Sequence, residues 1–275
     1  MYKKIELIGT DLDGTLLNDD KELTEETLFA LRNAHNKGVH IVPITGRPLR
    51  GVPSCIKELP QIEYIISSNG AEIFDVKNGC TLFSFSIDSK TSRVLIDELR
   101  KLDCMFEPFC DGAGYTEQSI FDYYVSTFKG TPLEDYFFSS RVICDSYEQL
   151  FDGKSKCAEE IFVNCAKAET RSRVIEIVEK LGGLQYCNLG DRFIEITKKG
   201  VDKGAALKAI CAHLGVDINN TIAFADGEND LEFMQAAGTA VAMENAFPII
   251  KNAADIITKS NNDNGVAIII NELIQ

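Results

Sequence analysis

The chain has 275 residues, of which 45% are hydrophobic and 25% charged, and its formal net charge is −14. This charge argues against binding to nucleic acid or to an anionic membrane, because both need basic patches. No apolar run approaches the roughly 20 residues that span a bilayer. The N-terminal residues lack the apolar core of a signal peptide, and no C-x-x-C pair occurs, so we expect a cytoplasmic protein.

The first third of the chain alternates strand and helix signals. Residues 5–10 are expected to form a buried strand, and residues 24–38 a helix that begins at the capping residue Thr24 and ends at Gly38. Two further short apolar strands are expected at residues 39–45 and 64–67. Helices between short apolar strands are typical of parallel β-α-β units.

The middle of the chain, residues 84–195, has a different pattern. Two helical segments, residues 89–103 and 168–182, each follow a strand signal and precede two short strand candidates. This arrangement indicates an internal repeat of the form β-α-β-β. The polar turns at residues 110–117 and 188–193 are expected to be hairpins between these strands. We therefore predict that residues 84–195 form a separate α+β domain inserted into the sheet domain.

The last part of the chain returns to the first pattern. Alternating helices and strands are expected at residues 203–215, 221–226, 231–238, 240–243, 247–254, 255–258 and 265–275. Residues 1–83 and 196–275 therefore look like the two halves of one doubly wound parallel sheet, and the predicted fold class is α/β.

Polar side chains follow four of the predicted strands. In an open parallel sheet, ligands bind beyond the carboxyl ends of the strands. Any one of these segments could be an ordinary turn or helix cap. A catalytic site is indicated when four strand–loop junctions carry, in this order, an aspartate, a threonine, a lysine and another aspartate. The residues are Asp11 and Asp13, Thr45, Asn69, Lys203, and Asp226 with Asn229 and Asp230.

These residue types fit phosphoryl transfer. Asp11 can act as a nucleophile that forms an aspartyl-phosphate, and Asp13 can protonate the leaving group and later deprotonate water. Asp11, Asp226 and a backbone carbonyl at Asp13 offer oxygen ligands suited to Mg²⁺. Lys203 and Thr45 can hold the phosphoryl group. A metal and a lysine would also attract an anionic substrate to an acidic protein.

At these residues the sequence closely resembles the haloacid dehalogenase superfamily, specifically its Cof-type sugar-phosphatase branch. The resemblance implies a Rossmann-like core, a large inserted α/β cap, and Mg²⁺-dependent hydrolysis of small phosphate esters such as sugar phosphates. The stretches that carry the resemblance are DLDGTLL, ITGRP, SSNGAEIFD, GVDKGAALKAI, IAFADGENDLEFMQAAG, VAMENA and NDNGVA.

The resemblance also implies roles for neighbouring residues. Asn229 is expected to contact the phosphate, and Asp230 to support the metal or Lys203. The backbone amides of Leu12 and Gly46 are expected to reach phosphate oxygens. For Arg47 two roles stay open: it grips the substrate at the mouth of the site, or it is a surface arginine paired with an acidic side chain.

Two positions depart from the family pattern, and two other functions stay open. Ala225 stands where glycine is common, and Thr10 where an aromatic or aliphatic residue is usual; neither change removes a catalytic group. The alternatives are a phosphomutase of the same superfamily and a non-catalytic metabolite-binding protein. The expected partner is a small phosphate ester, and the chain is expected to be a monomer or homodimer. No role is assigned to His35, His40 or His213.

Overall fold

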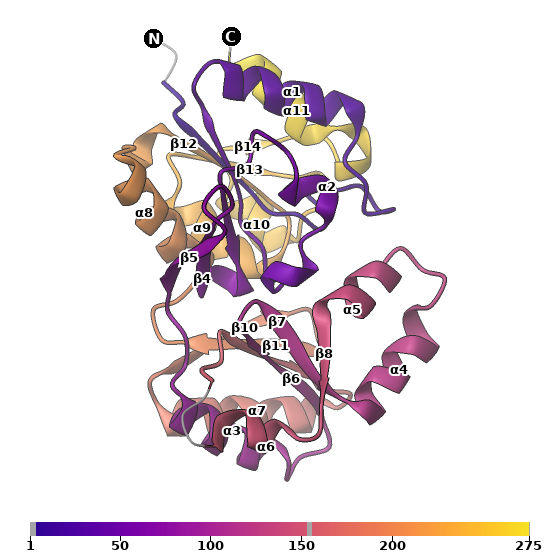
Figure 1. The fold of residues 1–275 in the computed structure, drawn as a ribbon. Helices are drawn as coiled ribbons and strands as arrows, with labels where there is room; N and C mark the ends of the chain where they lie inside the picture. Colours follow the sequence, from indigo (N-terminus) through magenta and orange to yellow (C-terminus); the bar gives the residue numbers. More distant parts are fainter. Residues whose placement is uncertain (1–3, 153–155, 275) are drawn as a thin grey trace.

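The computed structural model describes residues 4–152 and 156–274. Its elements form two parts, one above the other in Figure 1. The upper part, here called the core, holds both ends of the described chain, and the lower part is here called the cap. Each part has its own cluster of buried apolar side chains.

The core is built on a five-stranded parallel sheet. Its strands come from both ends of the chain, as predicted, and most of their residues are buried on both faces. Such strands carry continuous apolar runs rather than an alternating pattern. The order is β14 (Ile256–Ile257), β13 (Thr239–Ala242), β12 (Thr221–Ala225), β1 (Leu7–Thr10) and β2 (His40–Pro43).

Two groups of helices lie on opposite sides of this sheet (Figure 1). The predicted cap of the first helix is confirmed, because the Thr24 hydroxyl accepts a hydrogen bond from the Thr27 amide. One group is α1 (Glu25–Asn36) with α11 (Gly265–Leu273), and the other is α8 (Lys203–Leu214), α9 (Leu231–Ala236) and α10 (Pro248–Ala253).

The third predicted strand, β3 (Tyr64–Ser67), pairs differently on its two sides. Isolated parallel bridges join this region to the β2 side of the core sheet, at Ile41–Ile62 and Ile44–Ile66. Its other edge begins an antiparallel sheet of three strands, which the parallel pattern did not predict. That sheet continues with β4 (Glu72–Asp75) and β5 (Cys80–Ser84), and the connection before β3 contains η1 (Leu49–Gly51) and α2 (Ser54–Lys57).

The cap is a six-stranded sheet with helices over one face (Figure 1). Its strands run in the order β10 (Leu184–Leu189), β11 (Phe193–Lys198), β9 (Glu160–Asn164), β6 (Met105–Cys110), β7 (Ala113–Glu117) and β8 (Arg141–Cys144). The covering helices are α3 (Ser89–Leu99), α6 (Tyr147–Phe151) and α7 (Ala168–Leu181), and α4 (Gln118–Phe128) and α5 (Glu134–Ser140) stand to one side.

In both copies of the predicted internal repeat the helix and the two strands after it are correct. The strand before the helix belongs to the cap sheet only in the second copy, as β9 before α7. α3 is followed by β6 and β7, and α7 by β10 and β11; each strand pair is antiparallel. The strand before α3 is β5, which pairs with β4 in the three-stranded sheet instead of joining the cap sheet. The hairpin expected within residues 110–117 turns at Asp111 and Gly112, both with positive φ, as a two-residue turn requires.

Alternation along the cap strands leaves one face of the cap sheet turned toward the core. Ile161 and Val163 of β9 are buried in the cap cluster under the helices. Since neighbouring residues of a strand point to opposite faces, Glu160, Phe162 and Asn164 project from the other face. The predicted domain boundary between residues 195 and 196 falls inside β11. This strand therefore belongs to the cap sheet and also forms part of the junction between the cap and the core. The exact domain limits stay a prediction.

Candidate active site

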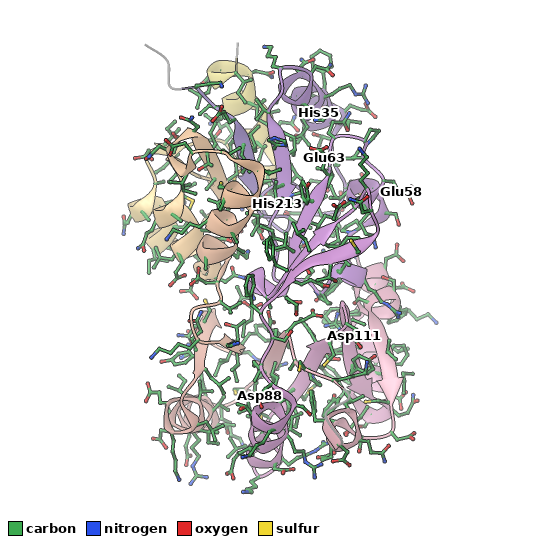
Figure 2. All side chains as sticks on the ribbon, turned by 60° about the vertical axis from the view of Figure 1, so that its left-hand side comes forward. His35, Glu58, Glu63, Asp88, Asp111 and His213 are labelled. Atoms are coloured by element: carbon green, nitrogen blue, oxygen red, sulfur yellow. The ribbon has the colours of Figure 1, made fainter. Side chains whose placement is uncertain are left out.

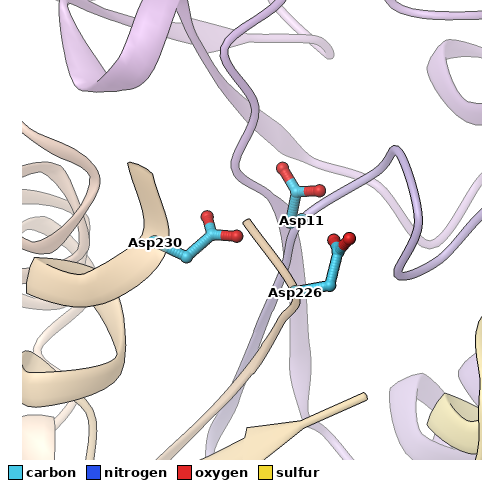
Figure 3. A group of neighbouring side chains, drawn as sticks. All are labelled: Asp11, Asp226 and Asp230. Carbon is cyan, nitrogen blue, oxygen red and sulfur yellow. The ribbon is translucent and has the colours of Figure 1, made fainter. Parts of the chain in front are cut away.

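Three carboxylates meet at the carboxyl edge of the core sheet. Asp11 follows β1, Asp226 follows the neighbouring strand β12, and Asp230 precedes α9. Each offers one oxygen, and these oxygens lie within 4.8 Å of one another. Figure 3 shows the three side chains converging from the two strand ends and the helix. Asp11 and Asp230 are buried, so these charges need compensation.

Lys203 supplies part of that compensation. It is the first residue of α8, whose start is capped by Asp202. Its Nζ lies 2.8 Å from Oδ1 of Asp11 and 2.6 Å from Oδ1 of Asp230. Burial alone would lower the pKa of Lys203, but the two carboxylates outweigh it and raise the pKa above its usual value. The lysine is therefore a permanent cation in direct contact with the expected nucleophile.

One ammonium does not balance three carboxylates. Burial raises the pKa of Asp11 well above its usual range, although Lys203 opposes this. Burial, with the charge of Asp230, also raises the pKa of Asp226 to about 7, and the Thr15 hydroxyl donates to this carboxylate at 2.8 Å. Raised carboxylate pKa values mark a site that lacks positive charge. Clustered carboxylate oxygens are the donors that a hard divalent cation prefers.

The turn after Asp13 brings the first loop against Asp226. Gly14 has φ +78°, and a Cβ atom there would stand 2.4 Å from Oδ2 of Asp226. Only glycine combines this backbone conformation with such a close approach. The glycine of the DGT segment is thus required for the assembly of the carboxylate cluster.

Asp13 points away from this cluster and toward Arg47. The guanidinium donates from Nε at 2.5 Å and from Nη2 at 2.6 Å, and Nζ of Lys21 lies 2.9 Å away. Burial would raise the pKa of Asp13, but the hydrogen bonds and charges of Arg47 and Lys21 outweigh it and lower the pKa to about 2. Arg47 is also fixed to the cap, because its guanidinium lies 4.4 Å from the ring centre of Tyr136.

A cavity of about 480 Å³ between the core and the cap is lined by most of the predicted residues. Thr45 is buried after β2, and its hydroxyl accepts from the Arg47 amide at 3.1 Å. The side chain of Leu12 is buried in the core cluster. Lys203 and Asp230 do not line this cavity. The predicted residues that line it are Asp11, Asp13, Thr45, Gly46, Arg47, Asp226 and Asn229.

Comparison with known proteins identifies the family. A family model described as haloacid dehalogenase-like hydrolase matches residues 8–270. The chain belongs to the haloacid dehalogenase-like hydrolases. YxeH of Bacillus subtilis strain 168 is 34% identical over 282 residues, covering 100% of this chain and 99% of YxeH. This result confirms the resemblance found in the sequence, the α/β fold class and the predicted enzyme class of phosphoric monoester hydrolase.

Two other similar proteins agree with this assignment. The 5-amino-6-(5-phospho-D-ribitylamino)uracil phosphatase YcsE of Bacillus subtilis is 29% identical, covering 96% of this chain and 93% of YcsE. A solved haloacid dehalogenase-like hydrolase from B. subtilis is 29% identical, with a TM-score of 0.86, and covers 98% of this chain and 100% of that chain. Within the described residues, no helix of this hydrolase is long and apolar enough to cross a membrane.

A buried polar network joins the core loop after β3 to the cap, and sequence reasoning missed most of it. Asn69 donates to Glu160 at 2.8 Å, while Asn229 donates to Asn69 and to Glu195, both at 3.1 Å. Burial, with the charge of Glu195, raises the pKa of Glu160. The alternating pattern of residues 193–197 could have marked Glu195 as a polar residue on the inner face. Asn229 is thus tied to the cap in this hydrolase.

The three histidines take no part in this site. Figure 2 shows His35 on α1 and His213 on α8, both in the core. The ring of His213 packs edge-on against Tyr64, with 5.7 Å between ring centres. His40 lies 3.2 Å from Glu63. None of the three histidines belongs to the carboxylate cluster or to the residues that line the cavity.

Proposed function

We propose that the protein is a Mg²⁺-dependent phosphatase that hydrolyses small phosphate monoesters through an aspartyl-phosphate on Asp11. The observation that carries this proposal is the Asp11 carboxylate, which touches Lys203, belongs to the three-carboxylate cluster and lines the cavity between the core and the cap. The proposed class includes the sugar phosphates expected from the sequence and the ribitylaminouracil ester for which YcsE is named.

The reaction has two halves. In the first, an oxygen of Asp11 attacks phosphorus, the new oxygen–phosphorus bond forms, and the bond to the ester oxygen breaks while a protonated Asp13 gives that oxygen its proton. Asp13 can carry this proton only if the bound phosphate group raises its pKa from the low value that Arg47 and Lys21 impose in this structure. In the second, water attacks phosphorus and gives a proton to Asp13. The bond to Asp11 then breaks, and inorganic phosphate leaves. Lys203 and Thr45 stabilise the charge of the phosphoryl group in both halves.

The chemistry of the carboxylate cluster fits the expected metal. Asp11 and Asp226 were predicted as ligands together with the backbone carbonyl of Asp13. Asp230, predicted to support the metal or Lys203, lies in the same cluster and contacts Lys203. Bound Mg²⁺ would supply positive charge at the phosphoryl oxygens. Metal binding would also compensate the carboxylate charge that Lys203 alone leaves unbalanced.

Release of phosphate from a panel of small esters, with Mg²⁺ and with a chelator, tests this proposal. We expect turnover with Mg²⁺, and its loss when the metal is removed. The phosphomutase alternative predicts an isomerised sugar phosphate with little free phosphate. The non-catalytic alternative predicts binding without turnover of any ester. Chelator-resistant hydrolysis would contradict the assigned role of the metal.

Arg47 has a testable role in holding Asp13. The Arg47→Met change removes both guanidinium hydrogen bonds to this carboxylate. We expect kcat for a small ester to fall about 10²-fold, because a misplaced acid/base group transfers its proton poorly. If Arg47 instead grips the substrate, KM rises and kcat stays the same. Steady-state kinetics separate the two roles.

Arg50→Met is the matched control for this test. Arg50 lies three residues further along the same loop and is exposed. A similar loss of kcat in Arg50→Met would show that the charge of the loop, and not the contact with Asp13, matters. An unchanged kcat and KM in Arg47→Met would contradict both roles.

A further inference from the structure

Two free cysteines, Cys104 and Cys165, face each other at the ends of the two central strands of the cap sheet. These strands, β6 and β9, are antiparallel, and their register pairs Met105 with Asn164. Cys104 immediately precedes β6 and Cys165 immediately follows β9, so the same register places the two cysteines directly opposite each other. Both side chains lie on the helix-covered face, because Cys165 belongs to the buried cap cluster and Cys104 packs against it. The two thiols therefore point the same way from adjacent strands.

The backbone brings these two cysteines as close as a cross-strand pair can be. The N–H of Cys165 points away from Cys104 and donates to the carbonyl of Arg192 at 2.7 Å. In an antiparallel ladder the N–H and C=O of one residue face the same neighbour, so Cys104 and Cys165 form a non-hydrogen-bonded pair. Such pairs hold their Cα atoms about 4.5 Å apart, and a disulfide needs a separation of roughly 4.4–6.8 Å. A bond between the two sulfurs therefore requires no movement of either strand.

The two thiols differ in access and in acidity. Cys165 is 1% exposed, whereas Cys104 is only partly buried. The hydrogen bond between the thiols lowers the pKa of Cys165, although burial opposes this change. The same hydrogen bond, together with burial, raises the pKa of Cys104. Because a thiolate is the attacking species and access decides which sulfur an oxidant meets, Cys104 is the sulfur that a small oxidant reaches and Cys165 is the better nucleophile.

We propose that Cys104 and Cys165 are a redox-sensitive pair that forms a reversible disulfide within the cap. The oxidant is a small-molecule disulfide such as oxidised glutathione. The small thiolate fraction of Cys104 attacks one sulfur of the oxidant, which gives a mixed disulfide and releases one free thiol. Cys165 then attacks the sulfur of Cys104, the bond between the two cysteines forms, and the second small thiol leaves. The cysteines lose two protons and two electrons in total, and the oxidant gains them as its own disulfide becomes two thiols.

The disulfide would join the two central cap strands beside the lining of the catalytic cavity. Asn164, the residue before Cys165, lines that cavity, and so does Arg192, whose carbonyl accepts from the Cys165 amide. The bond would also close the whole chain segment between residues 104 and 165 into a loop. A long loop closed in this way restricts the unfolded chain, so we expect oxidation to stabilise the cap.

Peptide mapping by mass spectrometry, after the full-length protein has been incubated with oxidised glutathione, tests the inference. We expect a peptide that links Cys104 to Cys165, and its loss when dithiothreitol is added. The thermal midpoint of the oxidised protein should be about 5 °C or more above that of the reduced protein. A stable mixed disulfide on Cys104 beside a free Cys165 would overturn the inference. So would two unmodified cysteines in a sample whose exposed Cys80 carries glutathione.

Two alanine variants complete the test. In Cys104→Ala, Cys165 loses its partner, so we expect it to stay free and the thermal midpoint to be the same with and without oxidant. Cys80→Ala is the matched control, because it removes an exposed cysteine of the core strand β5 and should form the cross-link as the wild type does. Oxidative stabilisation that persists in Cys104→Ala would overturn the inference. Neither measurement involves phosphate release, so the outcome is independent of the phosphatase proposal.

Discussion

Asp11→Asn is expected to abolish turnover, with kcat reduced about 10⁴-fold or more. An amide oxygen is a poor nucleophile, so the aspartyl-phosphate cannot form. The fold should persist, because the change removes one buried negative charge and leaves Lys203 paired with Asp230 at 2.6 Å. Phosphate release from a small ester with saturating Mg²⁺ measures the effect, and a thermal scan checks the fold.

The same substitution at an exposed aspartate is the control for this result. Asp145 lies in the cap and is exposed, so Asp145→Asn should keep wild-type activity. Near-normal kcat in Asp11→Asn would refute the nucleophilic role. A folded but inactive variant that still binds a phosphate ester would support it, because binding depends on Lys203, Thr45 and the metal rather than on nucleophilicity.

The core could be predicted because its signals are local. Residues 222–225 of strand β12 are a continuous apolar run, as expected for a strand buried on both faces. The helix at residues 25–36 carries its own start signal in Thr24. Because parallel strands end at a common edge, the positions of Asp11 and Asp226 followed from the order of the elements alone.

The cap was harder to predict because its structure depends on distant partners. The sequence of β5 predicts a strand but does not specify which sheet the strand joins. Its pairing with β4 is seen only in the folded chain. α4 was not predicted: aromatic residues are modest helix formers, and Glu117 makes no side-chain capping bond. Its stability comes from ring contacts with α5, such as Phe121 with Phe138.

The side-chain contacts of the site residues could not be predicted from sequence patterns either. Arg47 contacts Asp13, which lies 34 positions away, and Asn69 contacts Glu160 across 91 positions. The sequence left Arg47 open between a substrate contact and a surface ion pair with an acid. The structure shows a buried arginine that pairs with Asp13 and lines the cavity, so it is not a surface arginine, and its contact with substrate stays a prediction. Glu195 was not predicted as a site residue, because a glutamate in an alternating strand is usually exposed to solvent. In the structure it is buried at the junction of the core and the cap.

Lys203→Met is expected to reduce both stability and activity. Asp11 and Asp230 would lose their shared cation while buried, which costs about 3–5 kcal/mol of unfolding free energy. We expect the thermal midpoint without metal to fall by about 5–15 °C. Activity should fall by about 10²–10³-fold, because the phosphoryl group loses a charged hydrogen-bond donor. Thermal scans and phosphate release measure the two effects.

Two further variants separate the charge of Lys203 from its packing. Lys208→Met lies on the exposed side of the same helix and should change neither property. Adding Asp230→Asn to Lys203→Met removes one uncompensated carboxylate, so the double variant should regain part of the lost stability but none of the activity. If the double variant is as unstable as Lys203→Met alone, the loss comes from packing. That result would contradict the proposal that the charge of Lys203 stabilises the two buried carboxylates, Asp11 and Asp230, at this edge of the sheet.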